Sequence, residues 1–229
     1  TMRNLLMILG SVLLFPANLS AQAWAKDILA SSIEYHDPEG NWEQFSGSFT
    51  IEVTSKDKPS FTREVIIDLP QEYFELIETR GDDIKTYSID KGVYAAEDSI
   101  TQARTLKLRD YHTYLYGLPM KLKDPGAQID PKTERVIFHG RESIRMRVTY
   151  DPSVGSDTWF FYFNPENFAL IAYQFYHNEA IGDGEYILLE ELETVEGIKM
   201  PKIRSWYYNS DASYLGTDEL VSGRGSLNQ

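Results

Sequence analysis

The sequence has no cysteine among its 229 residues. Disulfide bonds, thiol nucleophiles and cysteine metal ligands are therefore excluded, and a hydrophobic core has to hold the chain together. A eukaryotic secreted domain of this size would more often carry disulfide bonds, so their absence favours a bacterial periplasm.

Histidine and the common catalytic motifs are also scarce. The chain has 4 histidines (His36, His112, His139 and His177), and no two lie at a metal-binding spacing such as HxxxH. The nucleophile motifs GxSxG and SxxK are absent, as are the phosphate-binding GxGxxG and P-loop patterns. We therefore expect no catalytic residues, no metal site and no cofactor.

Two acidic or histidine-containing segments keep an enzyme open as an alternative. His36 and Asp37, in "YHDPEGNW", could be a general base and its orienting partner. Glu190 and Glu191 alternate along a predicted strand, so one of them could face a cavity and have a shifted pKa.

In its context, however, "YHDPEGNW" is typical of the end of a helix. Pro38 restricts Asp37 and stops the helix at His36. We expect Asp37 to accept hydrogen bonds from the following backbone amides, and Trp42 to anchor the packing. A hinge between helix and sheet is thus the preferred interpretation of this segment.

Positive charge is in short supply. The sequence has 22 Lys and Arg against 35 Asp and Glu, a net charge of -13, and the acidic residues are dispersed along the chain. Such a field repels nucleic acid and anionic lipid surfaces. We expect no nucleic-acid partner.

The one long apolar run lies at the beginning, from Leu5 to Phe15, and a breaker follows at Pro16. It is too short to cross a bilayer comfortably, and it precedes the small residues of Ala21-Gln22-Ala23, as in a cleavable signal peptide. We predict a signal peptide over residues 1–23 with cleavage after Ala23. The mature chain, 24–229, should be one periplasmic or secreted domain, a monomer without stable membrane insertion.

The mature chain begins with a helical pattern and then changes period. A helix is predicted over 24–35, with an apolar stripe of Trp24, Ile28, Leu29 and Ile33. After it, apolar and polar residues alternate in segments bounded by turn residues, as in an antiparallel sheet. The predicted strands are 48–55, 61–70, 72–80, 84–90, 93–96, 134–140, 142–151, 157–164, 169–177, 185–192, 199–209 and one near Leu220.

A second helix interrupts these strands between Arg104 and Leu118. Its apolar residues recur at three- and four-residue spacing, so one face of the helix should pack on the sheet: Leu108, Tyr111, Leu115 and Leu118. A polar loop through Pro125 and Pro131 is expected to follow. Strands do not alternate with helices, which argues against a βα barrel or a doubly wound sheet and favours a mainly β (α+β) fold.

Aromatic residues are abundant, with 15 Tyr, 11 Phe and 4 Trp. In "TWFFYF" and "AYQFYH" they occupy both faces of neighbouring strands, which a sheet covered on one side would not need. Either the helices cover the second face, or this face lines a cavity. Burial of a long acyl chain there could gain on the order of 10 kcal/mol before ordering costs.

Several motifs carry a resemblance to known proteins. The hairpin "ELETVEGIKMPKI" and the strand–turn–strand segment "TWFFYFNPENFALIAYQFY" resemble the LolA/LolB-like lipoprotein-carrier superfamily. "YHDPEGNW" and "YLYGLPMKLKDPG" resemble a narrower family of exported proteins from Bacteroidota. The resemblance implies an unclosed, LolA-like β-barrel covered by helices around a hydrophobic cavity that takes a lipid.

We therefore predict a non-catalytic binding protein for an apolar or lipidic ligand. An envelope sensor or scaffold that binds a partner protein through the same sheet is the alternative. The residues expected to contact the ligand are Phe49, Ile51, Val53, Val65, Ile67, Met146, Trp159, Phe161, Tyr173 and Phe175 of the sheet, with Leu108, Tyr111, Leu115 and Leu118 of the helical lid.

Overall fold

A computed structural model describes residues 17–225 of the chain, so most of the predicted signal peptide lies outside the described residues. The structure contains two α-helices, α1 (Ala17–His36) and α2 (Ser99–Tyr116). Three short 3-10 helices accompany them: η1 (Trp42–Gln44), η2 (Met120–Lys123) and η3 (Glu179–Ile181). The helix predicted over 24–35 thus begins earlier, and α1 runs through the predicted cleavage position.

The remaining elements are strands of a single 12-stranded antiparallel sheet. Their bounds are β1 (Ser46–Ser55), β2 (Lys58–Asp68), β3 (Tyr73–Arg80), β4 (Asp83–Asp90), β5 (Val93–Tyr94), β6 (Ala127–Phe138), β7 (Arg141–Tyr150), β8 (Thr158–Phe163), β9 (Leu170–Tyr176), β10 (Glu185–Val195), β11 (Ile198–Tyr208) and β12 (Tyr214–Gly225). In space they follow the order β5-β4-β3-β2-β1-β12-β11-β10-β9-β8-β7-β6.

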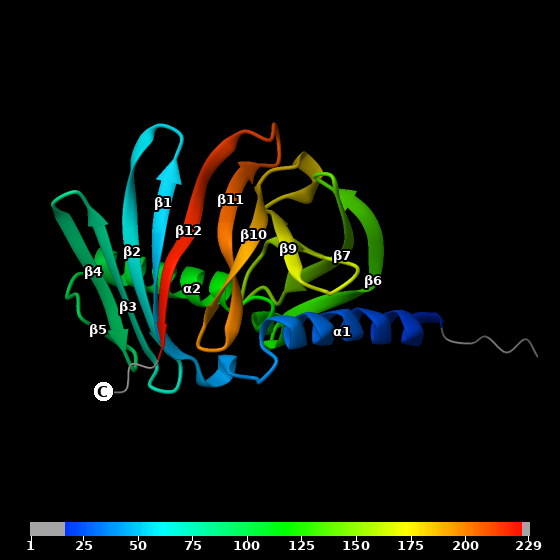
Figure 1. The fold of residues 1–229 in the computed structure, drawn as a ribbon, viewed down its shortest axis with the longest axis horizontal. Helices are drawn as coiled ribbons and strands as arrows, with labels where there is room; N and C mark the ends of the chain where they lie inside the picture. Colours follow the sequence, from blue (N-terminus) through cyan, green and yellow to red (C-terminus); the bar gives the residue numbers. More distant parts are fainter. Residues whose placement is uncertain (1–16, 226–229) are drawn as a thin grey trace, which may run out of the picture.

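The strand order explains the position of α2. The sheet consists of two meanders that meet where β1 pairs with β12, so its edges are β5 and β6. These two edge strands are connected by α2 and η2, and the connection crosses the open side of the curved sheet (Figure 1). The sheet stays unclosed, and α2 covers its concave face. The predicted mainly β half-barrel is confirmed.

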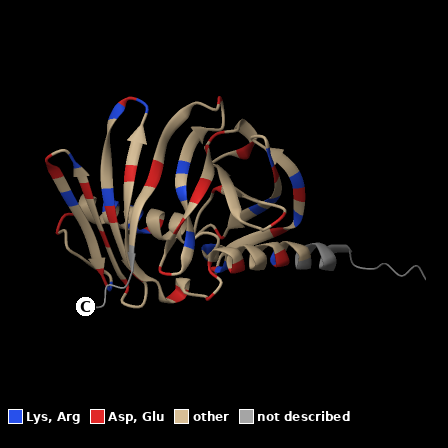
Figure 2. Ribbon diagram, in the orientation of Figure 1, with Lys and Arg blue, Asp and Glu red and all other residues tan. Residues whose placement is uncertain are grey.

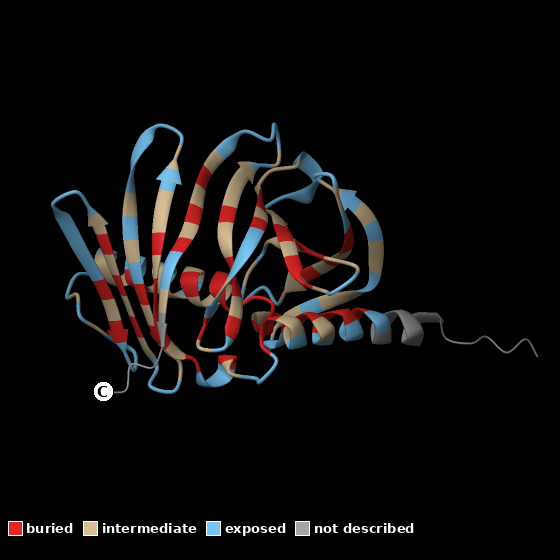
Figure 3. Ribbon diagram, viewed as in Figure 1, coloured by how far each residue is buried: buried red, intermediate tan, exposed pale blue. Residues whose placement is uncertain are grey.

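Alternation decides which side chains fill this concave face. Phe49, Val65, Leu76 and Tyr87 lie in register on four neighbouring strands, and all are buried. Figure 3 shows the same alternation of buried and exposed residues along the strands. Because each of these strands has one wet face, a one-residue slip would expose the whole row.

Helix α2 closes the core that this row begins. Asp98 caps its first turn by accepting a hydrogen bond from the Thr101 amide at 2.8 Å. At its other end Tyr116 stacks on Phe49 with the ring centroids 4.6 Å apart. The predicted stripe is partly wrong: Leu118 lies beyond the end of the helix, although it is buried in the core.

Two other sequence predictions need correction. In α1 the buried face consists of Ala25, Ile28, Leu29, Ser32 and His36, whereas Trp24, assigned to the apolar stripe, is 47% exposed. The predicted loop through Pro131 belongs to β6, whose pairing with β7 is irregular between Ile129 and Thr133. A proline is tolerated there because β6 is an edge strand with a bulge.

The motifs that carried the resemblance meet at the base of the half-barrel. Trp42 is buried against Gly117, where a Cβ would come within 2.2 Å of its indole ring. Asn41 donates a hydrogen bond from Nδ2 to the Glu196 carbonyl at 3.3 Å, across the turn of the β10–β11 hairpin. Three segments far apart in sequence thus lock one corner of the fold.

Candidate functional site

A cavity of about 1040 Å³ lies beside α2 on the concave side of the sheet. This volume is at the upper end of the roughly 300–1,000 Å³ typical of ligand pockets. Its apolar wall comes from α2 and from strands on both sides of it: Ile67, Leu69, Phe74, Tyr111, Tyr114, Leu115, Trp159, Phe175 and Trp206.

Aromatic rings make up much of this wall and contact one another. Trp159 stacks on Phe175 with centroids 4.9 Å apart, and Tyr114 meets Trp159 edge-on at 5.5 Å. The Tyr114 and Tyr150 hydroxyl groups hydrogen-bond to each other. Burial raises the pKa of Tyr150 to about 12, so this pair stays neutral and presents an uncharged surface.

The rim of the cavity is charged, with more acids than bases. Arg109 and Asp110 pair at 2.7 Å, and Lys121 pairs with Asp124. Further along, His177 hydrogen-bonds to Asp157 at 2.9 Å. Acidic and basic residues are otherwise dispersed over the sheet (Figure 2). The cavity is therefore lined by charged side chains as well as by the aromatic wall.

The predicted ligand residues divide into two groups. One group lines the cavity: Ile67, Tyr111, Leu115, Trp159 and Phe175. The other lies in the core or packs against it: Phe49, Ile51, Val53, Val65, Leu108, Leu118, Met146, Phe161 and Tyr173. On the concave face of the aromatic strands, α2 fills one section and leaves another open. Neither interpretation holds for the other face, where Phe160 and Tyr162 pack with Phe138 in a separate cluster.

Several wall residues were not predicted. Phe74 and Trp206 occupy inward positions of strands that the alternation had identified, so the pattern could have found them. Tyr114 lies outside the apolar stripe of α2 and gave no such signal.

His36 and Asp37 have structural hydrogen-bond partners. The buried His36 ring bonds through Nδ1 to the Lys199 carbonyl at 2.6 Å and accepts the Leu170 amide at Nε2, 3.0 Å away. Burial lowers its pKa to about 4. The Asp37 carboxylate accepts the Asn41 and Trp42 amides at 2.7 and 2.9 Å. Both ring nitrogens are occupied, so this pair has no free base, and the expected cap is confirmed.

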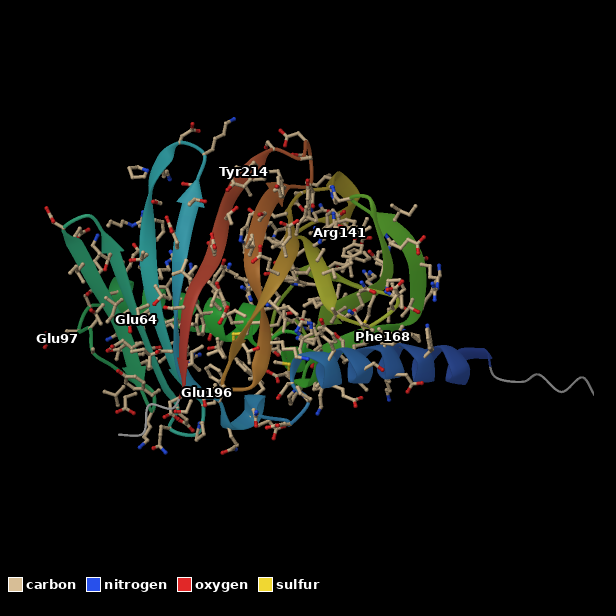
Figure 4. The ribbon with its side chains drawn as sticks, in the orientation of Figure 1. Glu64, Glu97, Arg141, Phe168, Glu196 and Tyr214 are labelled. Atoms are coloured by element: carbon tan, nitrogen blue, oxygen red, sulfur yellow. The ribbon has the colours of Figure 1, made fainter. Side chains whose placement is uncertain are left out.

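The second enzymatic candidate points to solvent. Glu190 and Glu191 are both exposed, because the strand has an irregularity at Glu191, whose φ is 52°. Glu190 pairs with Arg141 at 2.6 Å, and Arg141 is labelled in Figure 4. Neither acid therefore faces the concavity, and both lie in a solvated part of the strand.

Two other kinds of site are absent from the residues that the structure describes. Within 17–225, no three His, Asp or Glu side chains converge in a way that could hold a metal ion. In the same part of the chain, no helix has the length and apolar character needed to cross a membrane.

Comparison with solved structures identifies the fold. An outer membrane lipoprotein-sorting domain, provisionally so described, from Vibrio parahaemolyticus has a TM-score of 0.52 at 7% identity, over 93% of this chain and 94% of that one. A LolA superfamily protein from Nitrosomonas europaea has a TM-score of 0.48 at 13% identity, over 88% of this chain and 93% of that one. A DUF1329 family protein from Desulfovibrio piger has a TM-score of 0.47 at 8% identity, over 94% of this chain and 95% of that one. The unclosed sheet with its covering helix is thus a LolA-like half-barrel, as predicted.

A family model based on sequence assigns the chain to a narrower group than the fold does. The chain belongs to DUF6503, a family of unknown function that it matches over residues 3–223. No curated protein sequence matches it.

Proposed function

We propose that this protein is a periplasmic, non-catalytic binding protein that holds a lipid, an acyl chain or another apolar ligand in the cavity beside α2. The observation that carries the proposal is the aromatic wall around about 1040 Å³ of open volume. Removing apolar surface from water would supply the affinity. The lipoprotein-sorting description of the Vibrio domain supports this choice, although the similarity is one of fold.

Retention of lipid tests the proposal directly. Native mass spectrometry after gentle purification should detect a co-purified lipid, and a fluorescent fatty acid should bind. Phe175→Asp puts a charge into the wall and should weaken this binding at least about tenfold, because the ligand would have to lie against an unpaired carboxylate. Ile137→Asp, at a side chain 76% exposed on β6, is the matched control and should bind normally.

Two outcomes would reject the proposal. One is the absence of both co-purified lipid and fatty-acid binding. The other is equal binding by Phe175→Asp and the control, which would put any binding outside this cavity.

A second candidate function is binding of an envelope protein through the outward face of the sheet. This face carries its own aromatic cluster, in which Phe138, Ile171 and Tyr176 remain partly exposed around the buried Phe160 and Tyr162. A photo-crosslinker at Ile171 in this cluster should give a discrete product in cells, and one at Ile84 on β4 should not. Identical results at both positions would count against this candidate.

A further inference from the structure

Arg204 on β11 is a buried cation without sufficient partners. Its side chain is 0% exposed, its Nη1 donates to the Pro201 carbonyl at 2.7 Å, and its guanidinium carbon lies 3.7 Å from the Tyr116 ring centroid. Nε and Nη2, the two nitrogens of one edge, have no hydrogen-bond partner. A guanidinium stays charged in proteins, and burying it with open donors costs several kcal/mol. These open donors are therefore expected to bind a hydrogen-bond acceptor.

The charge of Arg204 acts on the buried Asp218, but in the described part of the chain no acid forms a hydrogen bond or ion pair with the free edge. Asp218 lies opposite Arg204 in the β11–β12 register, but its Oδ2 accepts the Tyr111 hydroxyl at 3.1 Å. Glu78 is paired with Arg63 at 3.0 Å. Among the described residues, Arg204 forms no ion pair within 4.0 Å, so its free edge is not occupied by a carboxylate of this chain.

A hydroxyl group beside this edge is also unpartnered. Tyr173 is 1% exposed and its hydroxyl has no hydrogen-bond partner of regular geometry. Burial raises the pKa of Tyr173, whereas the charge of Arg204 and a weak hydrogen bond with it act in the opposite direction, so the two side chains are neighbours. Arg204 and Tyr173 are thus neighbouring buried groups, and neither has all of its hydrogen-bonding atoms satisfied within the described residues.

Only one layer of rings separates these donors from the cavity. Trp206, two residues beyond Arg204 on β11, stacks on Tyr111 with centroids 6.0 Å apart. Tyr173 packs behind this layer, with its ring centroid 6.4 Å from that of Trp206 and 6.1 Å from that of Trp159. Trp206, Tyr111 and Trp159 line the cavity, whereas Arg204 and Tyr173 do not.

We propose that the ligand of this cavity carries a carboxylate, which Arg204 binds when the Tyr111–Trp206 layer opens. This rests on the proposed function and names the head group of its ligand. The planar edge formed by Nε and Nη2 matches the two oxygens of a carboxylate, and Tyr173 donates a third hydrogen bond. The rest of the ligand lies in the aromatic cavity.

The experiment compares a long-chain fatty acid with the alcohol of the same chain length. If the protein had no anion-binding group in the cavity, the acid should bind no more tightly than the alcohol, because its charge must be desolvated inside a protein of net charge -13. With the Arg204 site, the acid should bind at least about tenfold more tightly at pH 7. Competition with the fluorescent fatty acid measures both affinities on the unmodified protein.

Variants test whether Arg204 and Tyr173 cause the preference for the acid over the alcohol. Arg204→Gln and Tyr173→Phe should each reduce the ratio of acid to alcohol affinity while leaving alcohol binding intact. Arg141→Gln removes an arginine that pairs with Glu190 on the surface, and should keep the wild-type ratio. Tyr173→Phe keeps the buried ring and should fold, so it tests the carboxylate site even if Arg204→Gln fails to fold.

The outcomes separate the two proposals. Equal affinity for acid and alcohol would overturn the carboxylate site and leave apolar binding standing, with the Arg204 edge filled by water alone. An acid preference unchanged in Tyr173→Phe and Arg204→Gln would also overturn it. Failure of both compounds to bind would reject the proposed function itself.

Discussion

Acidification should destabilise this protein through His36. In the folded state the ring links the Lys199 carbonyl to the Leu170 amide, and burial lowers its pKa from 6.5 to about 4. The unfolded chain therefore takes up a proton as the pH falls below about 6.5, while the folded protein does not. The stabilising contribution is complete above that pH and is lost progressively as the pH falls to about 4.

The size of the loss follows from these two pKa values. Between pH 7 and pH 5, protonation of His36 in the unfolded state lowers the free energy of unfolding by about 2 kcal/mol. Urea unfolding at both pH values measures this loss for the wild type and for His36→Gln. The variant has no titratable ring, so it should lose about 2 kcal/mol less. At pH 7 it should already be less stable by about 1–3 kcal/mol, because a buried backbone group loses its partner.

His177→Gln is the control for this experiment. His177 is largely exposed, and its hydrogen bond to Asp157 raises its pKa, so its linkage has the opposite sign. Removing it should not reduce the acid-induced loss. Equal losses in the wild type and in His36→Gln, or an NMR titration of His36 near pH 6.5, would refute the reasoning.

Three further substitutions test the packing. Trp42→Ala should lower the free energy of unfolding by about 3–5 kcal/mol in urea, because a buried indole leaves a cavity; a loss below about 1 kcal/mol would contradict this. Gly117→Ala should cost about 1–3 kcal/mol through its clash with the Trp42 ring, and it should cost less in the Trp42→Ala background; additive losses would argue against the contact. Glu78→Gln should cost about 3 kcal/mol in thermal or urea unfolding at pH 7, because Arg63 keeps a largely buried charge without its partner; an unchanged midpoint would show that the pair is neutral in energy.

Much of the fold was predictable because alternation and turn residues are local signals. The β10–β11 hairpin is an example: Glu196 and Gly197 both have positive φ, 51° and 78°, as a tight two-residue turn requires. The pairing of β1 with β12 was not predictable in this way. Alternation identifies the two faces of a strand, but it carries no information on which distant strand is its neighbour.

The site was harder to predict than the fold. The aromatic run correctly drew attention to Trp159 and Phe175. The same pattern also selected Phe161 and Tyr173, which are buried under neighbouring side chains. An inward position on a strand can end beneath α2 or beside it, and only the path of the helix decides between the two. Arg204 gave no signal at all, because a lone arginine in a strand is ordinarily taken as solvated.

The path of α2 also determines how binding would affect the molecule. This helix contacts the sheet through apolar packing, such as Tyr116 on Phe49, and through the buried hydrogen bond from Tyr111 to Asp218. The same helix forms one wall of the cavity. A ligand in the cavity therefore contacts the element whose attachment keeps the half-barrel covered. If a carboxylate reaches Arg204, Tyr111 has to release Asp218, so the energy of that one hydrogen bond opposes entry of the head group while the apolar chain of the ligand favours it.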